Sequence, residues 1–143
     1  MMMQRILVIQ AAALGHSLVQ TLKPDMQIAG LELQPLQPVF PAVTCTAQAT
    51  FRTATTPDQH GMVGNGFFDR KYHKALFWEQ SSSLYDGRRI WDSFRQRGGT
   101  VGQMFWQQSL GQDSDLILSP APIHKHGGGM IQDCFSKPAE LYP

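Results

Sequence analysis

The sequence predicts an α/β fold, with a mainly parallel sheet flanked by helices. Residues 5–10 form a short run rich in aliphatic side chains that is apolar on both faces, which is typical of an interior strand in a parallel sheet. A tight turn and a helix-like stretch at 17–22 follow it, and this order opens many α/β domains. A second apolar run at 101–106 predicts another buried strand. In such a fold, the functional site is expected at the carboxyl ends of the strands.

The middle of the chain continues this alternation of strands and helices. We expect a second strand at 28–33 and, because three prolines interrupt it, a loop or extended connector at 34–41. A helix is expected at 44–53, where threonine is an acceptable N-cap and alanines fill the interior. Pro57 and Gly61 then predict a turn.

The remaining elements are shorter. We expect a hairpin at 67–68 and 76–78 after a turn at 64–66, an amphipathic helix at 90–97 ended by two glycines, and a last apolar strand at 116–118. Residues 119–143 contain four prolines and a triple glycine, so this tail is expected to be rich in loops.

Composition excludes several classes of protein. The 143 residues carry 12 Lys and Arg against 11 Asp and Glu, and this balance argues against binding a nucleic-acid polymer. An aromatic content of 10% argues against disorder. No apolar run approaches the roughly 20 residues that cross a membrane, and two cysteines make no disulfide framework. We therefore expect a cytoplasmic protein with one sizeable core and no membrane partner.

The segment with the clearest chemistry surrounds Thr44. A proline-rich connector delivers this hydroxyl to the start of a predicted helix, where unpaired N–H groups and the helix dipole favour negative charge. A threonine so placed can bind a phosphate, and can attack one if a metal ion lowers the pKa of its hydroxyl. Taken alone, the same residue is more often a structural cap.

The spacing after Thr44 carries a resemblance to a known family. With Thr44 as the nucleophile, the segment resembles the nucleophile region of the type I phosphodiesterase/nucleotide pyrophosphatase family, within the alkaline phosphatase superfamily. The family pattern then falls without a gap on Pro57, His60, Gly61, Val63 and Asn65. The likeness runs from residue 6 to about residue 106 and corresponds to the amino-terminal portion of that family's domain.

The resemblance implies a role for each matching residue. Thr44 would be the nucleophile and a metal ligand, usually to zinc in a two-metal site. Asn65 would donate its side-chain N–H to a phosphoryl oxygen, and the backbone N–H of Cys45 would be a second donor. Other interpretations remain open: Asn65 between two glycines suits a turn, the Cys45 thiol suits a small buried apolar group, and His60 suits a local hydrogen-bonding role.

The sequence departs from the family where metal ligands are expected. The aspartate that ends the family's first strand is replaced by Ala12 or Ala13, neither of which binds zinc, and Gln10 is a poor substitute. The asparagine three residues after the nucleophile is replaced by an alanine, and the family's other ligands come from its second half. His124 and His126 form the only close histidine pair. They could bind a metal or a phosphate, although an exposed polar loop is the simpler interpretation.

These observations predict a hydrolase of phosphoric esters that resembles the phosphodiesterases and nucleotide pyrophosphatases, acting on a small-molecule phosphodiester or nucleotide. One alternative is a phosphate- or nucleotide-binding module that lacks a competent metal site. Another is a partial chain that needs a partner polypeptide. Residues 1–143 would then be either one α/β domain or the amino-terminal part of a larger one, with self-association expected through an unfinished sheet edge or apolar face.

Overall fold

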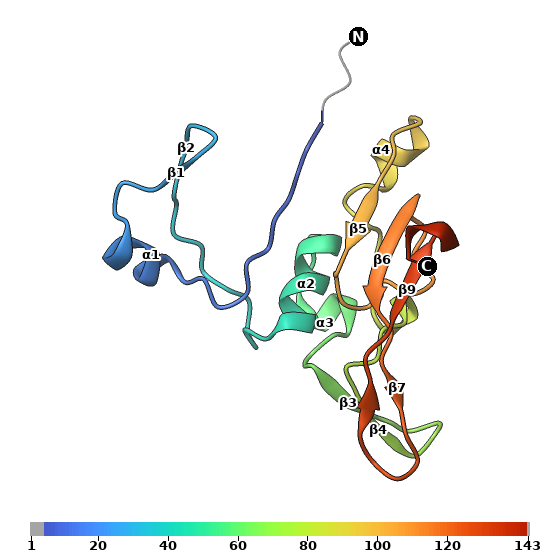
Figure 1. Ribbon diagram of the computed structural model, residues 1–143. Helices are drawn as coiled ribbons and strands as arrows, with labels where there is room; N and C mark the ends of the chain where they lie inside the picture. Colours follow the sequence, from blue (N-terminus) through green and yellow to red (C-terminus); the bar gives the residue numbers. More distant parts are fainter. Residues whose placement is uncertain (1–4, 143) are drawn as a thin grey trace. The chain divides into compact units, whose positions relative to one another are not determined.

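The computed structural model describes residues 5–142 and divides the chain into two compact units, residues 1–37 and 38–143 (Figure 1). The side chain of His124 also lies outside the described part. Each unit is described by itself. In residues 5–142, no helix has the length and apolar character needed to cross a membrane.

The first unit contains one helix and one small hairpin. Helix α1 spans His16–Leu22, as predicted. Strands β1 (Gln27–Ile28) and β2 (Leu31–Glu32) pair antiparallel, so the single strand predicted at 28–33 is wrong. The turn between them holds Ala29 and Gly30 at φ 51° and 77°, which is the left-handed geometry of a tight hairpin turn.

The strand predicted at 5–10 is also wrong. These residues have no regular structure, and their apolar side chains are exposed, Ile6 to 86%. A strand needs a neighbour that accepts and donates its backbone hydrogen bonds. Among the described residues, none of the strand pairings includes this segment.

The second unit begins with two helices that the sequence locates well. Helix α2 spans Thr44–Thr53, with the predicted bounds. Its N-cap is Val43 rather than a threonine, so Thr44 is the first helical residue and its hydroxyl is not used as a cap. The turn expected at Pro57 is a short helix, α3 (Pro57–His60), which ends at Gly61 with φ 78°.

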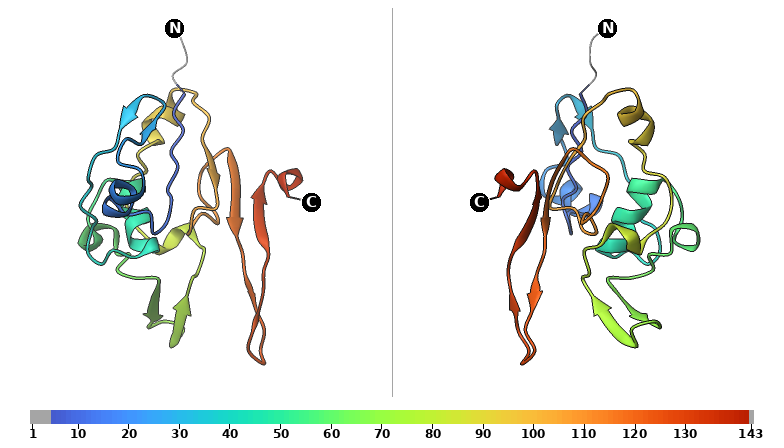
Figure 2. Two further views of the ribbon diagram at one scale, coloured as in Figure 1. Left: turned by 60° about the vertical axis from the view of Figure 1, so that its left-hand side comes forward. Right: turned by 90° about the vertical axis from the view of Figure 1, so that its right-hand side faces the viewer.

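The strands of the second unit form small sheets (Figure 2). The predicted aromatic hairpin is confirmed as β3 (Gly66–Asp69) paired antiparallel with β4 (Lys74–Phe77). Three strands form the largest sheet, in the order β5 (Gly102–Met104), β6 (Leu116–Pro120) and β9 (Cys134–Lys137). Short helices complete the unit: η1 (Ser82–Leu84), α4 (Asp92–Gln96) and η2 (Ala139–Leu141).

The structure is mixed α/β, but a mainly parallel sheet is not confirmed. Strand β5 pairs parallel to β6, whereas β6 pairs antiparallel to β9. The reason is the ribbon made by β7 (Ile123–His124) and β8 (Met130–Ile131), which turns the chain back beside β6. The tail at 119–143, predicted to be mostly loop, therefore contains paired strands.

The core of the second unit is unusually polar, and Arg52 is its largest fully buried side chain. Its Nη1 donates to the carbonyl of Gln108 at 3.2 Å, and its guanidinium lies 4.6 Å from the ring centroid of Tyr85 and 5.8 Å from that of Trp106. Neither of the ion pairs found among the described residues includes Arg52. Burial away from any counter-ion lowers its pKa to about 10.

Replacing Arg52 should therefore destabilise the unit through packing more than through charge. We expect Arg52→Ala to lower the free energy of unfolding by about 3 kcal/mol, because two aromatic rings lose their packing partner. Arg52→Met keeps most of the volume and removes an unpaired charge, so its loss should be about 1 kcal/mol. Urea unfolding measures both. Arg70→Ala, at an exposed position, is the control, and an equal loss in Arg70→Ala and Arg52→Ala would contradict this account.

Candidate functional site

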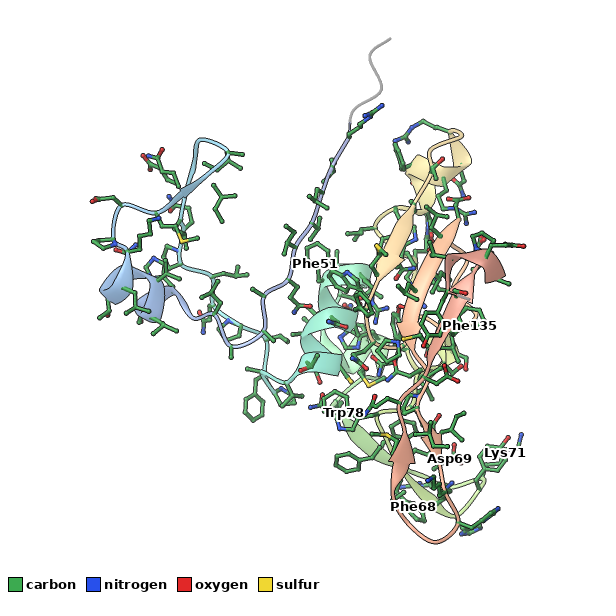
Figure 3. The ribbon with its side chains drawn as sticks, viewed as in Figure 1. Phe51, Phe68, Asp69, Lys71, Trp78 and Phe135 are labelled. Carbon is green, nitrogen blue, oxygen red and sulfur yellow. The ribbon has the colours of Figure 1, made fainter. Side chains whose placement is uncertain are left out.

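Thr44 stands at the amino-terminal end of α2, on the solvent-accessible side of the buried core. Its side chain is half-buried, whereas the next two residues, Cys45 and Thr46, are fully buried. Phe51, farther along the same helix (Figure 3), has its ring centroid 5.6 Å from that of Trp106. The helix is thus anchored by its inner face, and its first turn presents a hydroxyl where the dipole favours an anion.

Asn65 meets this first turn from a distant part of the chain. The backbone N–H of Cys45 donates to Oδ1 of Asn65 at 2.9 Å. Since an N–H group can be met only by an acceptor, this contact fixes which end of the amide is the oxygen. The Nδ2 group of Asn65 is then the end left to donate to a ligand. The structure thus brings together the two residues that the resemblance assigns to one phosphoryl group, and the Cys45 N–H is already engaged by Asn65.

His60 holds the segment between α2 and Asn65 in place through hydrogen bonds at both ring nitrogens. The N–H of Met62 donates to Nδ1 of His60 at 3.0 Å, so the ring proton lies on Nε2, which is 2.9 Å from Oγ1 of Thr50 and donates to it. The side chain is only 1% exposed. Burial lowers its pKa, because the charged imidazolium is poorly solvated there. This supports the local hydrogen-bonding interpretation, with a neutral ring.

The depressed pKa of His60 predicts a pH dependence of stability. The unfolded chain takes up a proton below pH ~6.5, while the folded state resists it, so the stabilisation is complete above that pH and is lost as pH falls toward the folded pKa. The loss is at most about 1.4 kcal/mol per pH unit. Urea midpoints at pH 7.5 and 5.5 should differ more for the wild type than for His60→Gln. An equal pH dependence in both proteins would overturn the assignment.

Cys45 is buried to 0% exposure, which confirms the interpretation of its side chain as a small buried group. Burial also raises the pKa of its thiol. The thiol is therefore protonated at neutral pH and is not a nucleophile. The Cys45 N–H, predicted to donate to a phosphoryl oxygen, donates to Asn65 in this structure.

The loop that follows β5 packs against this helix through glutamines. The N–H of Gln107 donates to Oε1 of Gln48 at 2.8 Å, and Nε2 of Gln108 donates to Sγ of Cys45 at 3.1 Å. Sequence reasoning missed this connection. The only signal was the glutamine pair after the predicted strand, and amide side chains at such a position are usually exposed.

The structure provides no set of metal ligands near Thr44. In residues 5–142, no three His, Cys, Asp or Glu residues come together in a group able to hold a metal ion, with the side chain of His124 left aside. His126 is exposed, and Ala12 and Ala13 belong to the other unit. Around the hydroxyl, Asn65 offers an amide and Cys45 a buried protonated thiol, which are weak ligands for zinc. These residues do not fit the two-metal site that the resemblance implies.

The chain is an α/β protein in which a hydroxyl and a side-chain amide lie at a helix N-terminus. These two groups define a candidate phosphate site. Comparison with protein families identifies it further. The model of the type I phosphodiesterase / nucleotide pyrophosphatase family matches residues 25–133, more than half of the chain, and the chain belongs to this family. The match contains both Thr44 and Asn65.

A curated relative agrees with the family. The chain is similar to ectonucleotide pyrophosphatase/phosphodiesterase family member 3 of Bos taurus, with 27% identity over 96 residues. The aligned part is 62% of this chain and 11% of the relative, so the chain spans only a small part of that protein. No solved structure matches the chain.

Proposed function

We propose that this chain carries the nucleophile region of a hydrolase of phosphodiester bonds, with Thr44 as the attacking residue. The observation that carries the proposal is the contact between the first turn of α2 and Asn65, twenty residues away in the sequence. Family membership supports the same chemistry. The substrate class would be a small phosphodiester or a nucleotide.

The proposed reaction has two displacements at phosphorus. The Thr44 oxygen attacks, forming an O–P bond while the bond to the leaving alkoxide breaks, and the hydroxyl proton ends on the released alcohol or nucleotide. Water then attacks the same phosphorus in the resulting threonine phosphodiester, the bond between phosphorus and the Thr44 oxygen breaks, and the phosphomonoester product leaves as the hydroxyl is restored. In both steps, Nδ2 of Asn65 donates to a non-bridging oxygen, where negative charge increases in the transition state.

The cofactor we propose is a divalent metal, for which the described residues form no ligand group. The family resemblance implies a divalent metal, zinc in our prediction, which would acidify the Thr44 hydroxyl. The donor set around Thr44 does not fit such a site. Ligands would have to come from a partner polypeptide or from further chain.

A second candidate is a phosphate-binding module without catalysis. The absence of a ligand cluster among the described residues favours it, and so does the alanine pair at 12 and 13, where the family has an aspartate. The same Thr44 and Asn65 groups would then bind the phosphate of a nucleotide without cleaving it. The cytoplasmic location and self-association expected from the sequence stay predictions in either case.

One experiment separates the two candidates. The purified chain is analysed for bound metal and assayed with bis(p-nitrophenyl) phosphate and with p-nitrophenyl phosphate, with and without added Zn²⁺. A hydrolase should cleave the diester in preference to the monoester. Absence of metal and of hydrolysis, with binding of inorganic phosphate retained, would overturn the catalytic proposal for this chain and favour the binding module.

A further inference from the structure

Gln108 is a buried residue that contacts the Cys45 thiol in the first turn of α2, whereas Asn65 contacts the Cys45 backbone N–H. Gln108 is 2% exposed, and its Nε2 donates both to Sγ of Cys45 at 3.1 Å and to the carbonyl of Glu79 at 3.0 Å. Its backbone is held as well: its N–H donates to Oε1 of Gln80 at 3.1 Å, and its carbonyl accepts from Arg52. Four contacts thus fix one side chain and its peptide groups.

Stability alone does not account for a glutamine at this position. Its Oε1 is buried without a hydrogen-bond partner among the described atoms, which is costly. Its backbone has φ 50°, a left-handed conformation that is uncommon for residues other than glycine. Strained, incompletely satisfied residues persist where the surroundings over-determine them, and they concentrate at functional sites.

Cys45 connects Gln108 to the candidate site through its thiol and its backbone N–H. The thiol is held by Gln108, and the backbone N–H of the same residue is held by Asn65. Both contacts converge on one residue in the first turn of α2, so we expect loss of the contact at the thiol to loosen the peptide between Thr44 and Cys45. That peptide carries the N–H that fixes the Asn65 amide.

We infer that Gln108 is a positioning residue, which acts through the Cys45 side chain to hold Thr44 and Asn65 in register for a phosphoryl group. That this arrangement of Thr44 and Asn65 serves catalysis rests on the proposed function, whereas the claim that Gln108 maintains the arrangement does not. Gln108→Met is the informative variant, because it keeps the volume and both backbone contacts and removes only the amide. Gln103→Met is the matched control, since Gln103 is 4% exposed and donates to Ser114 rather than to Cys45.

The first readout is amide exchange in ¹⁵N-labelled protein. In Gln108→Met, the Cys45 amide should exchange at least about tenfold faster relative to the Ala54 amide, which marks the other end of α2. The Asn65 side-chain resonances should shift with it. Gln103→Met should change neither. The inference is overturned if Cys45 exchange is unchanged in Gln108→Met, or if it changes equally in Gln103→Met.

The second readout is hydrolysis of bis(p-nitrophenyl) phosphate. Gln108→Met should lower kcat about tenfold with KM within about twofold, because misorientation affects the reaction more than binding. In a Cys45→Ala background, the Gln108 substitution should change kcat by no more than about twofold, as expected when one residue acts through another. A full effect in that background would overturn the route through Cys45. If the wild type itself does not hydrolyse, the proposed function fails, and amide exchange alone decides the inference.

Discussion

Thr44→Ala is expected to reduce phosphodiester hydrolysis by about 10⁴-fold, the scale at which covalent nucleophiles contribute in other hydrolases. The fold should tolerate this change. Thr44 is the first helical residue, Val43 is the N-cap, and α2 has no side-chain cap hydrogen bond, so the substitution removes no cap. Alanine is also the best helix former. We therefore expect an inactive protein with wild-type stability, measured by initial rates of bis(p-nitrophenyl) phosphate cleavage and by urea unfolding.

Thr44→Ser is the matched control for the hydroxyl. Serine keeps the attacking oxygen and loses one methyl group, so its rate should stay within about tenfold of the wild type. In the wild type, brief incubation with bis(p-nitrophenyl) phosphate followed by acid quenching should leave a p-nitrophenyl phosphoryl group on Thr44, detected by mass spectrometry. Equal rates in the wild type and Thr44→Ala would exclude this residue as the nucleophile.

The success of the helix prediction at 44–53 has a local cause. A proline-rich connector cannot continue a helix, and the following stretch of alanine and threonine has no proline or glycine before Pro57. The connector fixes where α2 begins, whereas its end at Ala54, with φ 52°, comes before any proline or glycine. The Asn65 position came from the family spacing instead; in the structure its side chain accepts the Cys45 N–H, and its role toward a phosphoryl group stays a prediction.

Predictions that depended on distant partners were less successful. The run at 5–10 has the composition of a buried strand, but composition does not supply a pairing partner, and its side chains are exposed. The prediction for 119–143 was wrong in the opposite sense, because a segment expected to be mostly loop contains strands. There, β8 pairs with β7 and β9 pairs with β6. Whether a segment forms a strand depends mostly on the neighbouring strands and side chains that it packs against.

The buried glutamines and Arg52 were beyond sequence reasoning for a different reason. Polar side chains are usually placed on the surface, and the exceptions are decided by which carbonyls and amides face them in the folded chain. Gln108 is buried because Cys45 and Glu79 accept its Nε2 hydrogens. No pattern along the chain indicates that contact.

Asn65→Asp should separate the structural role of Asn65 from its chemical role. An aspartate can still accept the Cys45 N–H, and its charge is favourable at the amino-terminal end of a helix, so stability at neutral pH should be unchanged or higher by about 0.5 kcal/mol. The Nδ2 donor is lost, however, and a carboxylate stands where a phosphoryl oxygen should bind. Hydrolysis should fall by about 10²- to 10³-fold. Steady-state rates and urea unfolding measure the two effects.

Asn65→Ala completes the comparison, because it removes the acceptor as well as the donor. Its stability should fall by about 1 kcal/mol with the loss of the bond to Cys45, and its rate should fall about as far as that of the aspartate variant. If Asn65 were only a turn residue, the two variants would behave differently. Asn65→Asp would be fully active, and the hydrolysis rate of each variant would change only as far as its stability does. The comparison also applies to a binding module: inorganic phosphate should perturb the Cys45 and Asn65 amide resonances in the wild type and not in Asn65→Asp, because the carboxylate repels the anion whether or not a bond is cleaved.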